Sequence, residues 1–419
     1  MDSPFAAYLV SVPLLALAGV LVLIAVRQVG NVRLQIWQIM TGAALVVLVT
    51  GSLSLDVALQ SVNLDVLLFL FGTFIIGQGL EESGYLGHVS YKYFKRATSL
   101  DQLFLIVMLG AGVASAVLMN DTVAIIGTPV VLLLARRHAI SAKPLLLALA
   151  FSITISSVMS PIGNPQNLLI ALHGNVPDPF ITFLHYLLVP TVLNLFAAFL
   201  LLRHYHRSEW HDAELRHSQE PIRDHALALL SKISLQTMIL LVIAKTLLSL
   251  VGAGEQFRLT HIALASCLPV LVGSSRRWGL LRRIDWHTLI FFAAMFILME
   301  GVWRTGFFQG VLAEWDPDIR SPEIILAWSV IGSQFISNVP LVALSLPLLD
   351  TVGAGTGALM ALAAGSTVAG NMFILGAASN VIIIQRAEGK AGETLGFWEF
   401  ARVGVPLTII NGAIYWLFL

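Results

Sequence analysis

Long apolar stretches, separated by short polar segments, alternate along the whole chain. A helix needs about 20 apolar residues to cross a bilayer, because each residue adds about 1.5 Å. The pattern therefore predicts an all-α polytopic membrane protein. The stretches form two series of seven: residues 5–26, 36–55, 62–80, 102–118, 123–134, 144–160 and 181–202, then residues 233–251, 260–272, 288–302, 324–337, 341–349, 358–372 and 400–419.

The composition excludes a water-soluble globule. Hydrophobic residues make up 57% of the 419 residues and charged residues only 11%, with a mean hydropathy of +0.84, whereas soluble domains average about 25% charged residues. Basic and acidic residues number 24 each, so the chain lacks the positive net charge that would indicate a nucleic-acid partner. Cys267 is the only cysteine, which rules out a disulfide framework or a multi-thiolate metal site within one chain. We expect no cofactor.

The two series also match residue by residue, which predicts an internal duplication. We therefore expect residues 1–203 and 233–419 to be two repeats, joined by a polar cytoplasmic linker at residues 204–232. Most of the matched residues are types that apolar helices normally avoid. Phe69, Phe74, Gly79 and Gly84 recur 222 positions later as Phe291, Phe296, Gly301 and Gly306; Asn120 and Pro129 recur 218 later as Asn338 and Pro347; Gly163 and Asn167 recur 213 later as Gly376 and Asn380.

The distribution of Lys and Arg among the short loops predicts the orientation, since cytoplasmic loops are enriched in both. All the Lys- and Arg-rich short loops lie on the cytoplasmic side if residues 102–118 and 123–134 enter and leave the membrane on the same side, as two legs of a re-entrant hairpin. Each repeat then has about five transmembrane helices, one hairpin and one broken helix. Five is odd, so the second repeat is expected to be inverted and both termini external. We expect the prokaryotic inner membrane as the location.

Polar segments interrupt four of the apolar stretches, and they are the candidate functional sites. Non-helical backbone at membrane depth is tolerated only where it is buried in protein or lines a wet cavity. Inverted-repeat transporters bind substrate near the midplane at such breaks, although each break alone could also be an ordinary kink or a small-residue contact between helices. The candidate substrate-binding residues are Asn120, Thr122, Gly163, Asn164, Gln166, Asn167, Ser337, Asn338, Gly376, Ser379 and Asn380.

Asp121 is the strongest single candidate for a functional residue within the apolar stretches. A carboxylate at membrane depth costs about 2.5 to 3.5 kcal/mol on insertion scales, so it usually faces a cavity and has a function. We expect Asp121 to couple transport to protons or another cation; the alternative is that it only caps a helix. Glu300 and Lys245 are also intramembrane ionisable residues, for which we favour a structural role. The linker histidines fit no compact metal motif, so we expect no metal site.

Four motifs resemble those of the ion transporter superfamily, in particular its ArsB/NhaD branch of arsenite permeases, sodium/proton antiporters and anion permeases. They are Asn120-Asp121-Thr122, the segment from Ser160 to Asn167, Ser337-Asn338-Val339-Pro340, and the segment from Gly376 to Asn380. The resemblance implies a secondary active transporter, with metalloid efflux driven by inward proton flow. It also implies that Asn167 and Asn380 surround substrate or sodium.

Electrostatics favours a neutral or cationic substrate. A carboxylate beside the site repels anions, and no Lys or Arg lies near the breaks in the sequence to offset it. Arsenite and antimonite are neutral trihydroxides at pH 7, which Asn, Ser and carbonyl groups can bind. A sodium- or proton-coupled anion permease and a sodium/proton antiporter remain alternatives, because residues 376–380 are closer to the anion permeases. A soluble ATPase subunit at the inner loops remains an open alternative as a partner.

Two other classes of membrane protein fit the sequence less well. A channel would not need duplicated breaks. An enzyme embedded in the membrane would need a nucleophile or a metal cluster, and no such His, Glu or Asp spacing occurs within the apolar stretches. We therefore do not expect an enzyme.

Overall fold

The protein is almost entirely helical in the part of the chain that the structure describes. The computed structural model describes residues 11–26, 28–29, 32–33, 35–85, 88, 97–138, 140–207, 222–250, 258–307, 310, 320–336, 338–391 and 395–419. Within these ranges the only strands are β1 (Gln28–Val29) and β2 (Val32–Arg33), which form one antiparallel pair. The expected all-α class is confirmed.

The order of helices repeats along the chain, as the matched residues predicted. Asn120 and Asn338 are the first residues of α8 and α18, and Asn167 and Asn380 are the third residues of α10 and α20. The first series is α2 (Val12–Val26), α3 (Ile36–Val49), α4 (Leu55–Ser61), α5 (Leu64–Glu82), α7 (Leu100–Leu118), α8 (Asn120–Arg137), α9 (Ala142–Ser157), α10 (Pro165–His173) and α11 (Pro179–Tyr205). The second is α12 (His225–Leu250), α13 (Leu259–Gly273), α14 (Arg277–Arg283), α15 (Trp286–Trp303), α17 (Pro322–Ile336), α18 (Asn338–Thr351), α19 (Thr356–Val368), α20 (Ala378–Ala391) and α21 (Phe397–Phe418), with 3-10 turns η2 (Ala369–Asn371) and η3 (Ile374–Gly376) between α19 and α20.

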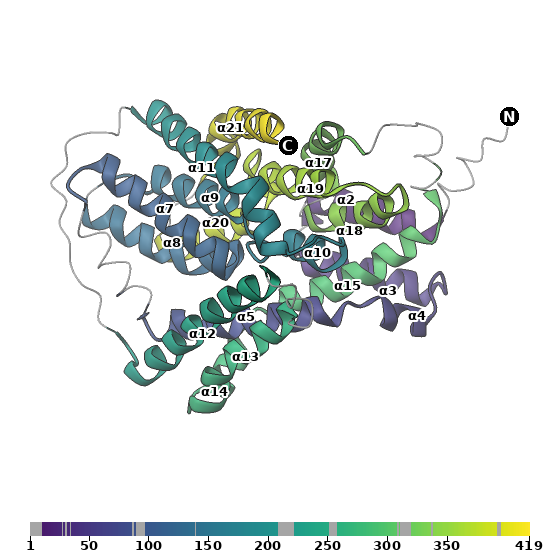
Figure 1. Ribbon diagram of the computed structural model, residues 1–419, viewed down its shortest axis with the longest axis horizontal. Coiled ribbons are helices and arrows are strands. Elements are labelled where there is room, and N and C mark those ends of the chain that lie inside the picture. The colour runs from purple at the N-terminus through teal and green to yellow at the C-terminus, as the bar shows by residue number, and fades with distance from the viewer. Residues whose placement is uncertain are drawn as a thin grey trace.

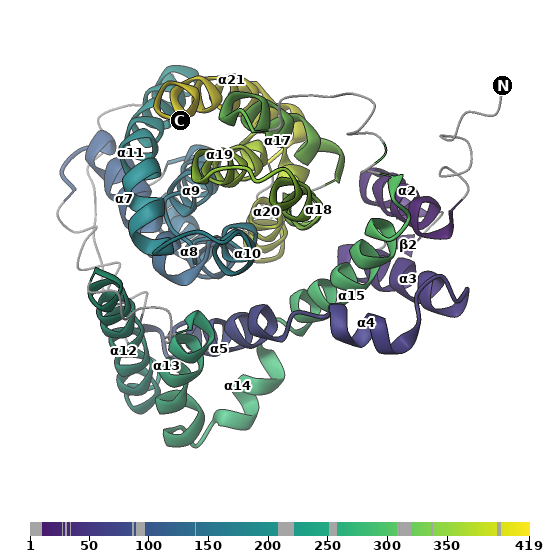
Figure 2. The ribbon, with the colours of Figure 1, turned by 45° about the vertical axis from the view of Figure 1, so that its right-hand side comes forward.

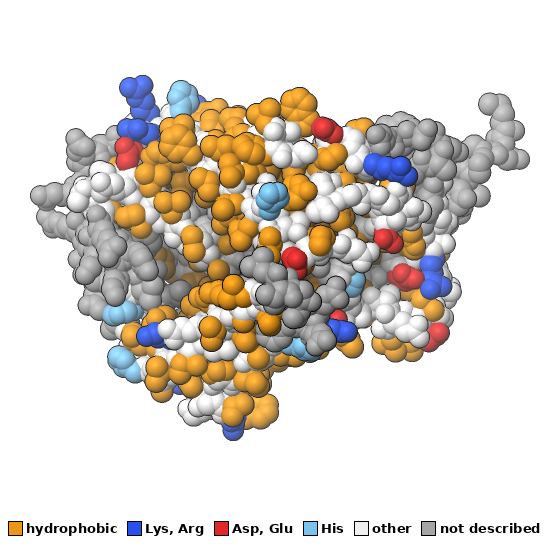
Figure 3. All heavy atoms as spheres, in the orientation of Figure 1, with side chains coloured by type: hydrophobic (Ala, Val, Ile, Leu, Met, Phe, Trp, Pro, Cys, Tyr) orange, Lys and Arg blue, Asp and Glu red, His pale blue; other side chains and the backbone are white. Residues whose placement is uncertain are grey.

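Six of the described helices are long and apolar enough to cross a membrane: α5, α7, α11, α12, α15 and α21. Their outer faces carry large exposed hydrophobic side chains, such as Phe196 of α11 and Leu240 of α12. Figure 3 shows hydrophobic side chains over much of one face of the molecule, with few charged side chains among them. Exposed apolar surface of this extent is typical of a protein that lies in lipid.

Helix ends follow local capping chemistry. The side chain of Asn63 accepts a hydrogen bond from the amide of Val66 at the start of α5, and Asp285 does the same for Thr288 in α15. α12 begins at His225, inside the range expected for the linker, and the carboxylate of Asp224 accepts a hydrogen bond from the amide of Leu227. Such caps satisfy amides that a helix leaves unpaired at its first turn.

The helices assemble into two lobes, and each lobe takes helices from both repeats (Figures 1 and 2). The hairpin lobe contains α7–α11 and α17–α21, with close packing of α7 on α9, α17 on α19, α8 on α20 and α11 on α21. The frame lobe contains α2–α5 and α12–α15, with α5 packed on α13 and α3 on α15. The lobes meet where α5 contacts α8 and α15 contacts α18.

Candidate functional site

The two legs of the first expected hairpin, α7 and α8, are joined by one residue, Met119. Its backbone has φ of 70° and ψ of 144°, a region that side-chain-bearing residues rarely adopt and that costs about 1 to 3 kcal/mol. Met119 is buried, and the hydroxyl of Thr73 on α5 lies 3.6 Å from its sulfur. The surrounding helices thus hold a strained turn at the hairpin tip.

The hairpin tip lies directly on the first helix break, residues 158–164, between α9 and α10. The amide of Asn120 donates to the carbonyl of Gly163 over 2.8 Å, and the hydroxyl of Ser160 donates to the carbonyl of Ala116 over 2.6 Å. A Cβ on Gly163 would lie 2.3 Å from the carbonyl oxygen of Ser157. Only glycine therefore fits where the break meets the hairpin.

Two asparagines close the ends of the half-helices at this break. Asn164 caps α10 by accepting from the amide of Asn167 over 2.8 Å. The side-chain amide nitrogen of Asn167 lies 3.0 to 3.1 Å from the carbonyls of Ser157, Val158 and Ser160. Asn167 therefore satisfies carbonyls that the end of α9 leaves unpaired.

Thr367, in the last turn of α19, links the first break to the second repeat. Asn164 and Gln166 each donate to the hydroxyl of Thr367 over 3.2 Å, and this hydroxyl lies 3.5 Å from Oδ1 of Asn167. Thr367 was not among the residues predicted from the sequence. The available signal was Thr154, which stands at the matching position 213 residues earlier.

The second break, residues 369–377, gathers the equivalent candidates from α18 and α20. The side-chain amide of Asn380 donates to the carbonyl of Gly370 over 2.7 Å, as Asn167 does to the end of α9. Nδ2 of Asn338 would lie 3.6 Å from a Cβ on Gly370, and a Cβ on Gly376 would lie 3.0 Å from the carbonyl oxygen of Ala369. Asn338, Gly376 and Asn380 thus lie together, whereas Ser337 lies outside the described residues.

Four buried polar atoms at the second break have no hydrogen-bond partner among the described residues. They are Oδ1 of Asn338, Oδ1 of Asn371, Oγ of Ser379 and Oδ1 of Asn380. These side chains are 7%, 0%, 0% and 1% exposed, respectively. The first break is more completely satisfied, because Oδ1 of Asn164 accepts from the amide of Asn167 and Oδ1 of Asn167 lies 3.5 Å from the hydroxyl of Thr367. An unpaired buried acceptor costs about 1 to 3 kcal/mol. A ligand that donates hydrogen bonds would therefore gain more binding free energy at the second break than at the first.

Asp121 and Thr122 lie in the first turn of α8, next to the hairpin tip. Asp121 is 8% exposed; its amide donates to Oδ1 of Asn120, and its carboxylate accepts no hydrogen bond or ion pair from the described residues. It therefore does not act as a helix cap. Thr122 faces the frame lobe, because a Cβ on Gly77 of α5 would lie 2.5 Å from its methyl group.

The other intramembrane ionisable residues lie away from the breaks. Glu300 forms an ion pair with Arg304 over 2.7 Å on α15, and Lys245 is buried on α12 in the frame lobe. In the described part of the chain no three His, Cys, Asp or Glu residues are placed to hold a metal ion. The buried polar groups of the two breaks and Asp121 therefore form the candidate site.

Comparison with known proteins indicates the family. Residues 10–358 match the profile of the citrate transporter family, CitMHS. The chain is 28% identical to the 46 kDa membrane protein of Mycobacterium leprae, over 91% of this chain and 92% of that protein. It is 27% identical to the silicon efflux transporter LSI3 of Oryza sativa subsp. japonica, over 88% of this chain and 89% of that protein.

A solved structure shares the fold. The crystal structure of the Alcanivorax borkumensis YdaH transporter aligns with a TM-score of 0.59 over 99% of this chain and 97% of that chain, at 16% sequence identity. The resemblance to the ion transporter superfamily is supported at the level of this family, and the narrower ArsB/NhaD assignment stays a prediction. The chain belongs to the citrate transporter family and is a multi-pass membrane transporter.

Proposed function

We propose that this transporter exports a small neutral metalloid hydroxide, arsenite or antimonite foremost, in exchange for protons. The observation that carries the proposal is a group of three unpartnered atoms that α18 and α20 bring to the second break: Oδ1 of Asn338, Oδ1 of Asn380 and Oγ of Ser379. These atoms are matched by a ligand that brings hydrogen-bond donors. A trihydroxide brings three.

The orientation of the Asn380 side chain supports this reading. Its amide nitrogen is engaged by the carbonyl of Gly370 over 2.7 Å, which leaves the oxygen as the free end. A hydroxyl group can donate to that oxygen, whereas a carboxylate cannot. The chemistry of the free end therefore favours hydroxides over carboxylate anions.

The charges of the site support a ligand without negative charge. Asp121, His138 and Lys245 are the buried Asp, Glu, His, Lys and Arg side chains of the described part of the chain. Lys245 lies in the frame lobe, so no buried Lys or Arg accompanies Asp121 in the hairpin lobe. Citrate, from which the family takes its name, would need the N-termini of α10 and α20 to offset its charge, and each supplies only about half a unit of positive charge.

The rice relative is consistent with this substrate class. It is named a silicon efflux transporter, and silicon dissolves at neutral pH as a neutral tetrahydroxide. Silicic acid and arsenite present the same chemistry, a compact uncharged centre surrounded by hydroxyl groups. We therefore extend the proposed substrate class to silicic acid.

Asp121 is the proposed coupling residue. A carboxylate without a hydrogen-bond or ion-pair partner among the described residues can take up a proton in one state of the cycle and release it in another. Export of substrate would then be exchanged for proton entry across the prokaryotic inner membrane. The alternative function is that of a sodium- or proton-coupled anion permease, since amide and carbonyl oxygens can also bind a cation.

Transport into everted vesicles tests the proposal. We expect a proton gradient with an acidic vesicle lumen to drive accumulation of arsenite, antimonite or silicic acid. Citrate should neither accumulate nor compete with these hydroxides for transport. Asn380→Leu should weaken apparent affinity about tenfold or more, because it removes the oxygen that is proposed to accept a hydrogen bond from the ligand. The control is Asn175→Gly, because Asn175 is exposed, its φ of 52° is one that glycine adopts freely, and its side chain makes only a long contact of 3.4 Å with Asp350 among the described residues. Accumulation of citrate without the hydroxides would overturn the proposal.

A further inference from the structure

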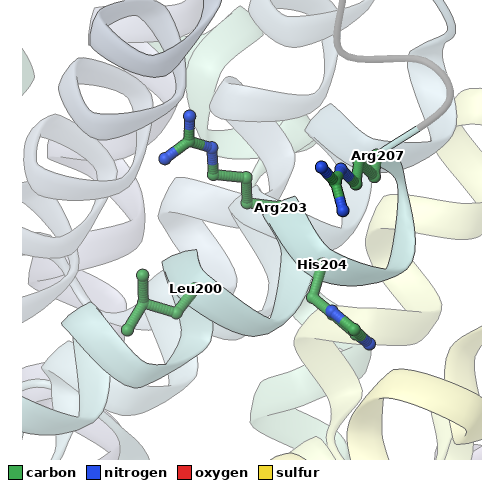
Figure 4. A pocket seen from close by; sticks show the side chains of 4 residues that line it. All are labelled: Leu200, Arg203, His204 and Arg207. Carbon is green, nitrogen blue, oxygen red and sulfur yellow. The ribbon is translucent and has the colours of Figure 1, made fainter.

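A basic hollow at the end of α11 lies outside the candidate site. It has a volume of about 390 Å³ and is lined by Leu200, Arg203, His204 and Arg207. Arg203 and Arg207 extend to the same side of the helix end, and Leu200 lies one turn before them (Figure 4). The loop side of the hollow is thus strongly basic, and its membrane side is apolar.

An apolar ridge leads along α11 to this hollow. Leu184, Leu188, Val192, Phe196 and Leu200 follow one another at intervals of four residues, and each is 40 to 56% exposed. Neighbours at this spacing lie next to one another on a helix, so the five side chains form a continuous row that is inclined to the helix axis. The ridge ends where the basic residues begin, since Leu200 belongs to both.

The charge of the hollow is only partly satisfied by the described residues. Arg203 forms an ion pair with Asp101 at the start of α7, over 3.1 Å, with both side chains partly exposed. Arg207 has no acidic partner among the described residues. An arginine pair of this kind binds the oxygens of a phosphate group well, because the guanidinium fork matches their geometry.

We propose that this hollow binds the phosphate of an anionic phospholipid, whose acyl chain lies along the ridge of α11. Arg203 and Arg207 contact the phosphate, and Phe196 and Leu200 contact the first part of the chain. A free phosphate ion would use the arginines and leave the ridge unused. The continuity of apolar and basic surface on one helix end therefore favours the lipid.

The experiment uses the full-length protein in detergent, with native mass spectrometry as the readout for bound lipid. The probes are phosphatidylglycerol, which is anionic, phosphatidylcholine, which has the same phosphate but no net charge, and inorganic phosphate as a competitor. We expect preferential retention of phosphatidylglycerol. Arg207→Gln should weaken its binding about fivefold, the effect of one arginine at an anionic membrane surface. Leu200→Gln should also weaken it, since the chain contact is lost.

The matched control is Arg282→Gln, which removes an exposed arginine from the short helix α14 of the frame lobe. It should leave phosphatidylglycerol binding unchanged. Equal retention of phosphatidylcholine, or an equal loss in the Arg282 variant, would overturn the proposal. Displacement of the lipid by an equal concentration of inorganic phosphate would do so as well, because it would reveal a simple anion site.

Discussion

The side-chain amide of Asn411 donates a hydrogen bond to Oδ1 of Asn194 over 2.8 Å, and this contact joins α21 to α11, the last helices of the two repeats. Both residues are fully buried. Each follows a proline inside its helix, Pro406 and Pro190, respectively. The two repeats are therefore held together by an asparagine pair at corresponding positions.

Only the second break is tied to this pair. The side-chain amide of Asn371 in η2 donates to Oδ1 of Asn411 over 3.0 Å. With the offset that matches Gly163 to Gly376, Asn371 corresponds to Val158, which offers no hydrogen-bonding side chain to Asn194. Asn371→Val should therefore leave a buried amide oxygen unpaired and lower the free energy of unfolding by about 1 to 3 kcal/mol. Thermal unfolding in detergent measures this, and an unshifted midpoint would contradict it.

Gly163 is expected to tolerate no side chain. In Gly163→Ala the new Cβ would lie 2.3 Å from the backbone oxygen of Ser157, so the break must move away from the amide of Asn120. Overpacking of this kind costs about 1 to 3 kcal/mol or more, and we expect transport to be lost. Gly279→Ala in α14 is the control, because nothing lies within 4 Å of its added Cβ. Transport at the wild-type rate in the Gly163 variant would show that transport does not require the close packing of the break against the hairpin tip.

Asp121→Asn should uncouple transport from the proton gradient. The substitution keeps the shape of the side chain and removes its titration, so gradient-driven accumulation in everted vesicles should be abolished while some downhill exchange remains. The pH dependence of exchange should flatten. Asp56→Asn, which changes an exposed carboxylate on α4, should behave as wild type. Persistent accumulation against the gradient would shift the coupling role to Glu300.

The ion pair between Arg386 of α20 and Glu81 of α5, 2.8 Å long, joins the two lobes. A partly exposed pair contributes about 0.2 to 1 kcal/mol, so Glu81→Gln and Arg386→Gln should each change the transport rate by up to about fivefold. The double variant should match the single ones, and a charge swap should restore the wild-type rate. Breaking the pair of Arg283 with Glu82, which lies within the frame lobe, should leave the rate unchanged. If the swap fails to restore the rate, the pair does not control it.

The inverted orientation of the repeats is tested by labelling single cysteines from each side of the membrane. Asp178 immediately precedes α11 and Arg277 begins α14, and both residues are exposed. The five expected crossings per repeat place them on opposite faces. The background is Cys267→Ala, which removes a buried cysteine. Labelling of both positions from one side would show that the repeats are not inverted.

Much of the fold could be predicted because its determinants are local. Hydropathy indicates α5, α11 and α21, since a helix in lipid must satisfy its own backbone within one segment. The duplication showed that Asn120 and Asn338 mark equivalent positions, and the structure places both at the start of a hairpin leg. The short helices α4 and α14 were not predicted. They are too brief to produce a strong hydropathy signal.

The contacts that build the candidate site depended on the tertiary structure. Thr367 meets Asn164 across a separation of 203 residues, and Asn411 meets Asn194 across 217; no local pattern encodes either pairing. The lobes also mix the two repeats, so neighbours in space are distant in sequence. The sequence thus determined which residues stand at the helix breaks. Which of their polar atoms remain unpaired depended on how helices from both repeats packed, because a buried group is satisfied only by what lies beside it.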